Sequence, residues 1–400
     1  MPVTFFADKQ YQKYTKNKIQ RVKIATRDLM VDVVENGKIV VNPSTHAYGV
    51  FDANNKFVKS SLQYKGKTHQ FIPKYPSGQI DVMNGDAVFM GYVVNHFGHF
   101  LIEQLSRAWG VLKHRTPGMK FVFVNNRGIV VPGYVYKFMK LLNISESDVM
   151  VLDAPCKFNR VFIPEQSFRL SNTVYCAPEF VTAFREMAHN TKSKYDYDKV
   201  YVSRAKLPND IRTYGEEKIQ NIFQDNGFTV IYPETLDLFD QVAIMKNCRV
   251  LAGCAGTALH LALFMENAER VIQIKRNTIN NDSAYVQYAI NTLVGADSVF
   301  VSGSVEKYKS GHGGNHAPQI IGITDDMARF FDCEHFVYSD TSAVAASDWD
   351  SYETQLKLFQ ENNGGAFILK VKKRFIKYIS CLVPGRINRD RFRRWLKNHL

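Results

Sequence analysis

The sequence lacks the features that would mark a secreted or membrane-spanning protein. It has no apolar run near about twenty residues, so we expect no segment to cross a bilayer. Its first eighteen residues contain neither an apolar stretch nor a small-residue cleavage site, which argues against a secretory signal. The six cysteines are scattered without a C-x-x-C pair, which indicates reduced thiols in a cytoplasmic protein rather than disulfides or structural zinc.

The motifs of common cofactor sites are missing as well. The chain contains neither G-x-G-x-x-G nor G-x-x-x-x-G-K-[ST], which excludes the usual dinucleotide and P-loop sites. The segments expected to form a cleft carry no Asp-x-Asp pair for Mn²⁺ or Mg²⁺. His312 and His316 lie in a glycine-rich loop, but no carboxylate or cysteine accompanies them at ligand spacing, so a linker, a lid or an acceptor loop is expected there. We therefore predict no metal and no cofactor.

Positive charge is abundant but unevenly placed. The 400 residues carry a formal charge of +13, and residues 370–400 hold eleven Lys and Arg against the single acid Asp390. Eleven minus one is +10, which leaves the rest of the chain almost neutral. Proteins that bind duplex nucleic acid usually spread their basic residues over a folded face. Because the basic residues here concentrate in one terminal segment, we expect no nucleic-acid partner.

The basic segment has the pattern of a membrane-surface anchor. Its Lys and Arg residues alternate with apolar and aromatic ones such as Phe375, Phe392 and Trp395, and Pro384-Gly385 divides the segment. Basic amphipathic helices of this kind lie on anionic lipid. The alternative is a solvated tail that packs on the body. We expect C-terminal helices over residues 340–400, ending in a basic amphipathic tail that associates with an anionic membrane surface.

Short apolar segments alternate with helical ones along most of the chain, which predicts open parallel sheets of the α/β class. In the first half we expect a helix over 99–114, a strand over 120–126, a helix over 134–142 and strands over 148–153 and 159–165. In the second half we expect strands over 199–204, 228–233, 249–253 and 270–274, with helices over 214–226, over 236–247 and from 257 onward. The polar segment 188–199 separates a domain over 1–190 from a Rossmann-like domain over 196–330.

The strongest candidate site lies at the strand ends of the second domain. The loop after its first strand carries the basic residues Arg204, Lys206 and Arg212, which suit a diphosphate. Its third strand leads into GCAGTALH, residues 253–260, where glycines allow close approach of the backbone and Thr257 can cap a helix. Taken alone, the glycines could serve packing only, but together with the basic loop they predict a phosphate site.

Glu234 follows the second strand of the same domain. A carboxylate at such a place can accept hydrogen bonds from ribose hydroxyls. It can equally belong to the acidic first turn of the helix that begins near residue 236. Both interpretations stay open at the level of the sequence.

In the first domain, polar residues concentrate within an apolar helix, NHFGHFLIEQLSRAW, over residues 95–109. His99 and Glu103 share a helix face, and Arg107 follows one turn later. Either His99 or Glu103 could take a proton from a hydroxyl, and Glu103 is favoured because Arg107 can steady it. The alternative is a surface ladder that only stabilises the helix, but the apolar neighbours indicate a buried one.

Taken together, these residues resemble glycosyltransferase family 61, in particular its bacterial members of capsule and surface-polysaccharide synthesis. The likeness spans roughly residues 90–275 and is strongest over 199–274. The residues that carry it are His99, Glu103, Arg107, Tyr201, Ser203, Arg204, Arg212, Glu216, Glu217, Gly227, Phe228, Pro233, Glu234, Gln241, Gly253, Gly256, Leu259 and Phe264.

The resemblance implies a GT-B-type fold, in which two Rossmann-like domains face a cleft. It implies an inverting, metal-independent transfer from a nucleotide sugar, with UDP the usual nucleotide, to a growing bacterial surface polysaccharide or glycolipid. The enzyme would be cytoplasmic and peripheral on the inner face of the inner membrane.

The resemblance also assigns roles to residues. The implied base is Glu103 or His99, and Arg204 would hold the diphosphate. The implied donor site is completed by Lys206, Arg212, Glu234, Gly253, Gly256, Thr257 and His260, while Asn95, His96 and Arg107 would support the acceptor side. One departure is Ala255, where many members carry His, and His260 would partly substitute for it.

Two other functions fit the same sequence. A transferase that uses CMP-Kdo or a CDP-polyol would share the basic loop, and donor screening would separate it from the first hypothesis. A non-catalytic protein of polysaccharide assembly would have no use for a carboxylate such as Glu103 in a cleft. The sequence specifies neither the sugar, the acceptor, the linkage nor the oligomeric state.

Overall fold

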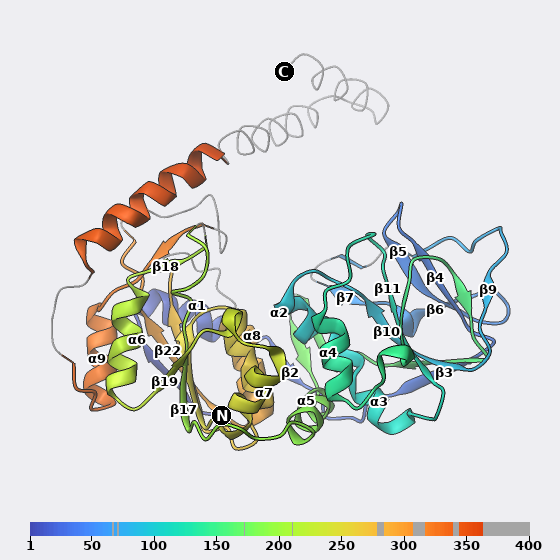
Figure 1. Ribbon diagram of the computed structural model, residues 1–400, viewed down its shortest axis with the longest axis horizontal. Coiled ribbons are helices and arrows are strands. Elements are labelled where there is room, and N and C mark those ends of the chain that lie inside the picture. The colour runs from blue at the N-terminus through green and yellow to red at the C-terminus, as the bar shows by residue number, and fades with distance from the viewer. Residues whose placement is uncertain are drawn as a thin grey trace, which may run out of the picture.

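The structure, a computed structural model, describes residues 1–65, 68–69, 72–171, 173–209, 211–277, 284–306, 317–338 and 344–362. The elements gather in two regions, one around β10 (Asp86–Tyr92) and one around β17 (Lys199–Val202), which we call the first and the second unit (Figure 1). The predicted basic tail and the loop of His312 and His316 lie outside the described residues. Within the described ranges, no helix is both long enough and apolar enough to cross a membrane.

A six-stranded, all-parallel sheet forms the second unit. Its order is β1 (Val3–Phe6), β22 (Asp297–Ser302), β21 (Arg270–Lys275), β20 (Val250–Cys254), β17 and β19 (Thr229–Ile231). Along the chain, β19 is added on one side of β17 and β20 on the other. The direction of strand addition therefore reverses between β17 and β20, and open α/β sheets bind their ligands at the carboxyl ends of the strands at such a reversal.

Helices of the second unit include α6 (Glu216–Asp225), α7 (Leu238–Asn247), η6 (Thr257–Phe264), α8 (Ala284–Val294) and α9 (Asp325–Cys333). Asp237 caps α7 by accepting from the N–H of Phe239 at 2.9 Å. The predicted strands and helices of residues 199–274 are confirmed, with one correction. Thr257 does not cap an α-helix, because η6 is a 3₁₀ helix that no side chain caps. Its TALHLALF sequence is apolar on nearly every side and buried, so it lacks the one-sided pattern of a surface α-helix.

The first unit holds a second sheet, in the order β12 (Val149–Leu152), β11 (Lys120–Val124), β10, β14 (Arg160–Pro164) and β3 (Val31–Glu35). Only β3 is antiparallel to its neighbour. The strands β11, β12 and β14 and the helix α4 (Tyr134–Leu141) match the sequence-based elements. The central strand β10 was not predicted, although its DAVFMGY sequence is a short apolar run. Here too the strand order reverses, between β10 and β14.

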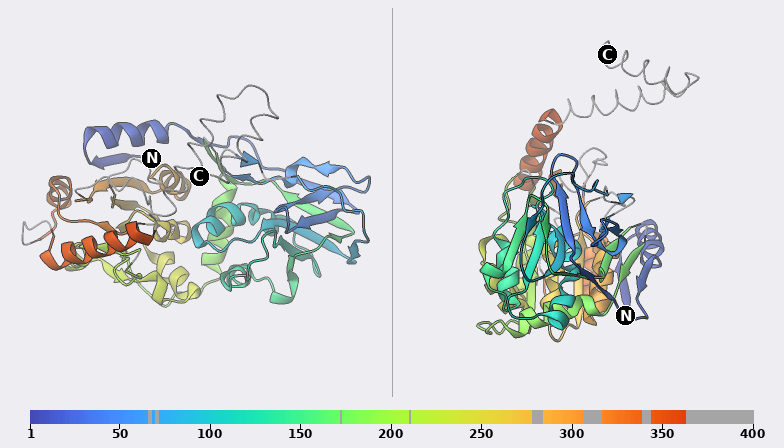
Figure 2. Two further views of the ribbon diagram at one scale, coloured as in Figure 1. Left: turned by 90° about the horizontal axis from the view of Figure 1, so that it is seen from above. Right: turned by 90° about the vertical axis from the view of Figure 1, so that its right-hand side faces the viewer.

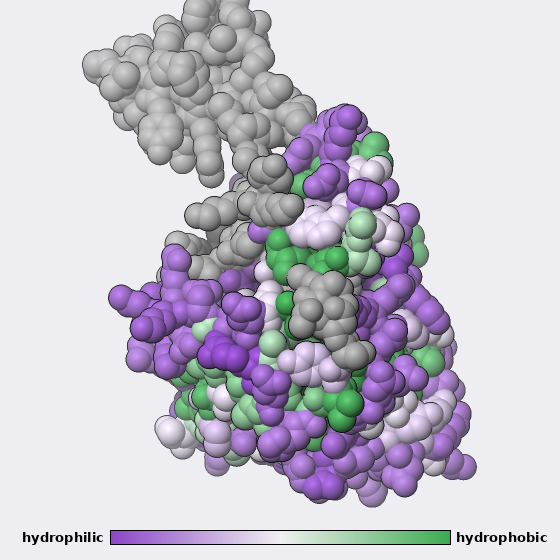
Figure 3. All heavy atoms as spheres, turned by 90° about the vertical axis from the view of Figure 1, so that its left-hand side faces the viewer, coloured by the Kyte–Doolittle hydropathy of each residue, from purple (hydrophilic) through white to green (hydrophobic). Residues whose placement is uncertain are grey.

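Smaller sheets extend the first unit. One contains β6 (Phe57–Val58), β5 (Ala47–Phe51), β4 (Lys38–Asn42), β13 (Cys156–Lys157) and β9 (Asp81–Val82). Another contains β2 (Val22–Ile24), β16 (Val174–Cys176), β15 (Phe168–Leu170), β7 (Tyr64–Lys65) and β8 (Thr68–His69). A pair of short strands, β18 (Thr213–Tyr214) and β23 (Gln319–Ile320), lies on the second unit, and Tyr352 of a helix over 346–362 packs on it. The outer face of this unit is largely hydrophilic (Figure 3).

The beginning of the chain lies in the second unit. The strand β1 pairs in parallel with β22, with Val3 opposite Ser298 and Phe6 opposite Val301. The helix α1 (Lys9–Ile19) then runs along the outside of this unit and contacts α8 (Figure 2). The sequence-based division assigned residues 1–190 to a first domain. The strand β1 lies in the second unit instead, because this apolar strand pairs with β22, which would otherwise be an edge strand.

Helices from both units share one hydrophobic core. The ring of Phe264 in η6 stacks on Phe138 of α4, with centroids 6.3 Å apart, and meets Phe184 of α5 (Glu179–His189) edge-on at 5.4 Å. All three rings are at most 1% exposed. This packing fixes the strand ends of one unit relative to those of the other.

Candidate active site

A cleft of about 670 Å³ lies between the two units. From the first unit it is lined by His96, Phe97 and Gly98 at the start of α2 (Phe97–His99) and by Tyr134 and Lys137 of α4. From the second unit it is lined, among others, by Ser203, Arg204, Glu234 and Thr257. Because these residues follow β17, β19 and β20, the cleft opens at the carboxyl ends of the second sheet, beside the reversal of its strand order.

The helix that carries His99 and Glu103 is irregular. It passes from α2 into a π-helix, η2 (Phe100–Gln104), then into a 3₁₀ turn, η3 (Leu105–Arg107), and ends as α3 (Trp109–His114). Single π-turns inside helices occur often at functional sites. Here the π-turn contains Glu103, so the wider turn sets where its carboxylate lies.

His99 and Glu103 form a hydrogen-bonded pair, as their spacing predicted. The Nδ1 of His99 lies 2.9 Å from Oε1 of Glu103. The side chain of His99 is 38% exposed, whereas that of Glu103 is 2% exposed. The hydroxyl of Tyr92, the last residue of β10, donates to the other carboxylate oxygen at 3.3 Å. Glu103 therefore sits behind His99, held from two sides, and only the imidazole reaches outward.

This arrangement assigns the proton on the imidazole. A carboxylate accepts from Nδ1–H, which leaves Nε2 of the neutral ring as the acceptor. His96 supports the same turn, because its Nδ1 accepts from the backbone N–H of His99 at 3.2 Å and its ring centroid lies 4.5 Å away. The pair has the geometry of a general base with a carboxylate that orients it.

Arg107 does not support Glu103 as the sequence suggested. Its guanidinium donates to the backbone carbonyl of Pro164 and to those of Ser60 and Leu62, at 3.1 and 3.0 Å. The residue is 1% exposed, and burial lowers the pKa of its guanidinium to about 10. The expectation assumed regular α-helical spacing, which η2 and η3 do not keep. Arg107 instead ties the end of β14 to the segment that follows β6.

Arg204 lies at the second wall of the cleft, against the turn that follows β20. A Cβ atom added to Gly256 would lie 3.2 Å from Nη1 of Arg204, so the glycine lets the guanidinium approach the backbone. Nη2 donates to the carbonyl of Ile211 at 3.3 Å. Nε is buried and has no hydrogen-bond partner among the described residues. The side chain is therefore anchored but keeps donor capacity.

The two walls meet at a pair of small residues. A Cβ atom added to Gly98 would lie 2.6 Å from Oγ1 of Thr257, so the first turn of α2 touches the first turn of η6. Gly253 has a different role from Gly256. A Cβ atom there would lie 2.7 Å from Val202, so this glycine serves the close packing of β20 on β17.

Nine of the predicted site residues are not among the described lining of the cleft, namely His99, Glu103, Arg107, Gly253, Gly256 and the four that follow. Lys206 is exposed, with Nζ 3.9 Å from the centre of the Tyr232 ring, and Arg212 forms an ion pair with Glu217 at 2.5 Å. Asn95 is exposed on the loop before α2. His260 is buried, with Nδ1 2.8 Å from Oε1 of Gln287, so it does not take the place that Ala255 leaves open.

The imidazole of His260 is neutral at physiological pH. Burial lowers its pKa to about 4, and the nearby rings of His99 and His96 act in the same direction. Its contribution is therefore a hydrogen bond in the core between η6 and α8, rather than a positive charge for a phosphate.

Two ionisable residues near the turn from β20 to η6, Glu216 and Arg276, received no role in the sequence-based site. Glu216, at the start of α6, is fully buried and accepts from the hydroxyl of Tyr201 at 3.3 Å. Burial raises the pKa of Glu216 to about 7, although Arg204 opposes the shift. Arg276 directly follows β21, at the same carboxyl edge as Arg204. A basic residue immediately after a parallel strand is the signal that could have identified it.

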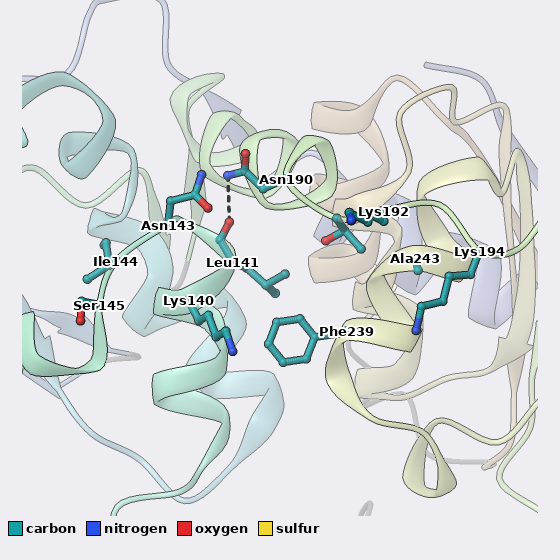
Figure 4. A pocket seen from close by; sticks show the side chains of 11 residues that line it. Lys140, Leu141, Asn143, Ile144, Ser145, Asn190, Lys192, Lys194, Phe239 and Ala243 are labelled. Carbon is teal, nitrogen blue, oxygen red and sulfur yellow. Dashed lines mark hydrogen bonds between the residues drawn. The ribbon is translucent and has the colours of Figure 1, made fainter.

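A second hollow, of about 540 Å³, lies between α4, the end of α5 and α7. Lys140, Lys192 and Lys194 line it, together with Phe239 (Figure 4). The side chain of Asn190 donates to the carbonyl of Leu141 at 2.9 Å on its inner wall. Neither a histidine nor a carboxylate is among its described lining residues, so it offers no base, and the cleft at Arg204 is the better active-site candidate.

Across the described ranges, no group of three or more His, Cys, Asp or Glu side chains is arranged to hold a metal ion. The expectation of a metal-free reaction stays a prediction, to be tested with a chelator.

The cleft has Arg204 on one wall and the turn of His96 and Gly98 on the other. Residues 97–272 match the family model Glycosyltransferase 61. The match begins at the helix of His99 and ends within β21, so it includes residues from both walls of the cleft. This match supports a family 61 domain within the chain and, with it, a glycosyltransferase, which acts on a sugar donor and an acceptor. None of the curated proteins matches it.

Proposed function

We propose that this glycosyltransferase moves a sugar from a nucleotide-sugar donor, bound at the carboxyl ends of β17 and β20, to a hydroxyl of an acceptor bound against the first unit. The observation that carries the proposal is the cleft, which has Arg204 and Thr257 on one wall and the turn of His96 and Gly98 on the other. Arg204 and the first N–H groups of η6 suit a diphosphate. Glu234 lies at the end of β19, where a carboxylate can accept from ribose hydroxyls.

The proposed reaction is a single displacement with inversion. The acceptor oxygen forms a bond to the anomeric carbon while the bond from that carbon to the diphosphate breaks, and the electron pair leaves with the diphosphate. The proton of the acceptor hydroxyl passes to Nε2 of His99. Arg204 and backbone N–H groups meet the charge that develops on the leaving group, so the reaction needs no metal.

Burial favours His99 as the base and Glu103 as its orienting partner, the reverse of the order that the sequence favoured. The carboxylate is 2% exposed and already accepts from both His99 and Tyr92, whereas the imidazole is 38% exposed. Glu103 would hold the tautomer and stabilise the imidazolium that forms when the proton arrives.

The finer identities in this proposal rest on the family resemblance. They are UDP as the nucleotide and a bacterial surface polysaccharide or glycolipid as the acceptor. The location on the inner face of the inner membrane rests on the sequence of residues 370–400, which lie outside the described ranges.

A thermal-shift panel tests the donor class. The purified protein is melted in EDTA with UDP, CDP, GDP, CMP or uridine, and then with the sugar conjugates of the nucleotides. We expect a nucleoside diphosphate, UDP by preference, to raise the melting temperature, and uridine to leave it unchanged. A protein stabilised by CMP alone would point to a CMP-linked donor, and one stabilised by none of them would contradict the proposed donor site.

A further inference from the structure

A second arginine lies beside Arg204. Arg276 immediately follows β21, which is the neighbour of β20 in the sheet, so the two arginines share one carboxyl edge. Arg276 is 5% exposed. Its Nε donates to the carbonyl of Ala255 at 2.6 Å, within the turn that leads from β20 to η6. The guanidinium is thereby pinned to the turn against which Arg204 also lies.

The hydrogen bonds around Arg276 are incomplete. Its Nη1 is buried and has no hydrogen-bond partner among the described residues, and the same holds for Nε of Arg204. Buried guanidinium N–H groups almost always find a partner, because desolvating them without one is costly. If Arg276 only held the carbonyl of Ala255, its Nε would be sufficient. Such a structural role does not explain why Nη1 is buried without a partner in the described part of the chain.

The electrostatics of the two arginines also favour an anion. Burial lowers the pKa of Arg276 to about 10, and the positive charge of Arg204 is the next largest cause. The positive charges of Arg204 and Arg276 therefore repel each other in a poorly solvated place. Glu216 and Glu306 act in the opposite direction, but the hydrogen bonds to Glu216 come from the hydroxyl of Tyr201, the thiol of Cys254 and the backbone of Arg204.

From these contacts we infer that Arg276 is a second guanidinium for the diphosphate of the donor, held by the turn that Arg204 also contacts. This inference rests on the proposed function, because it names a further residue of the same site. Nη1 of Arg276 and Nε of Arg204 would both donate to phosphate oxygens. As the bond to the sugar breaks, they would stabilise the charge that stays on the diphosphate.

Inorganic pyrophosphate is the probe, because it does not depend on the identity of the base or the sugar. Its binding is measured by calorimetry in EDTA for the wild type, Arg276→Gln and Arg276→Lys. The matched control is Arg270→Gln, at the other end of the same strand, where Arg270 pairs with Glu334 at 2.6 Å and is 39% exposed. A lost charge-assisted hydrogen bond should weaken binding by about tenfold or more.

We expect Arg276→Gln to lose about tenfold in pyrophosphate affinity, Arg276→Lys to lose less, and Arg270→Gln to match the wild type. The melting temperature of Arg276→Gln without ligand should not fall below that of Arg270→Gln, because the substitution removes a repelling buried charge. Unchanged affinity in Arg276→Gln, or a loss that only accompanies a lower melting temperature, would overturn the inference while the proposed function stands. A wild type that binds neither pyrophosphate nor UDP would overturn both.

Discussion

The two units share a design but place different chemistry at their strand ends. Each has a mostly parallel sheet whose strand order reverses once, at β17 and β20 in the second unit and at β10 and β14 in the first. In the second unit, arginines follow the strands, namely Arg204 after β17 and Arg276 after β21. In the first, Tyr92 ends β10, and the helix that follows carries His99 and Glu103. Each sheet supplies positions, and the residues that follow its strands give the second unit cations for the proposed diphosphate and the first unit the pair proposed to move a proton.

Removing the proposed base, His99, should have the largest effect. His99→Ala should lower turnover by about 10²- to 10⁴-fold while the affinity for the nucleotide stays within about twofold, because a general base acts on the proton and not on the diphosphate. Turnover with the donor identified by the thermal-shift panel, and calorimetry with UDP, measure the two quantities.

A substitution of Glu103 shows which of the two residues, His99 or Glu103, is the base. Glu103→Gln keeps an oxygen that can accept from Nδ1–H of His99, so we expect a loss of about tenfold to 10²-fold, smaller than for His99→Ala. If Glu103→Gln were dead and His99→Ala kept measurable turnover, Glu103 would be the base, as the sequence suggested. If both kept near-normal turnover, the helix would be structural.

Removing the cation Arg204 of the second unit should weaken nucleotide binding, which the substitution of His99 should leave unchanged. Arg204→Ala should weaken UDP binding by about tenfold or more, and turnover should fall with it, because a charge-assisted bond to phosphate is lost. The matched control is Arg249→Ala, just before β20 at the other edge of the same sheet, where exposed ion pairs with Asp198 and Glu269 contribute little to stability. Equal UDP affinity in both variants would remove Arg204 from the donor site.

The histidine buried between η6 and α8 should make stability depend on pH. Its folded pKa of about 4 lies below the ordinary 6.5, so the stability is present above pH 6.5 and is lost as the pH falls toward 4. The full shift corresponds to about 3 kcal/mol in the free energy of unfolding.

His260→Asn keeps a donor for Gln287 but cannot take up the proton, so its unfolding free energy should fall less than that of the wild type between pH 6.5 and 4.5. Glu216 acts in the opposite direction, because its raised pKa of about 7 gives stability below pH 4.5 that is lost as the pH rises. That contribution cancels when the two proteins are compared. Parallel pH profiles from chemical denaturation would show that His260 is not the titrating group.

The smallest expected effect is that of a chelator. Turnover in EDTA should stay within about twofold of that in buffer, because Arg204 and the N–H groups of η6 offset the charge of the leaving diphosphate. Loss of turnover in EDTA that Mn²⁺ restores would show that the second unit needs an ion as well as its arginines.

Much of the fold follows from local patterns. The strands β17, β19, β20 and β21 and the helices α4, α6 and α7 lie where apolar periodicity and turn residues predicted them, because each is decided by its own residues. The strand β1 shows the limit of such patterns. Its pairing with β22 joins residues almost the whole chain apart, and nothing local in VTFF specifies that partner.

The site divides in the same way. The contact between His99 and Glu103 could be predicted from spacing alone, and so could the place of Arg204 at a strand end. The proposed order of their roles could not, because it rests on burial, with Glu103 behind the imidazole. The role of Arg107 depends on the π and 3₁₀ turns before it, which direct its guanidinium to backbone carbonyls. That of Arg276 depends on its contact with Ala255.

A crystal structure of the protein with UDP, grown in EDTA, tests the central claim most directly. The account predicts the diphosphate at the carboxyl ends of β17 and β20, within hydrogen-bond distance of the guanidinium of Arg204 and of the first N–H groups of η6. The terminal β-phosphate should point toward His99. UDP bound instead in the lysine-lined hollow between α4 and α7, or at the carboxyl ends of β10 and β14 in the first unit, would contradict it.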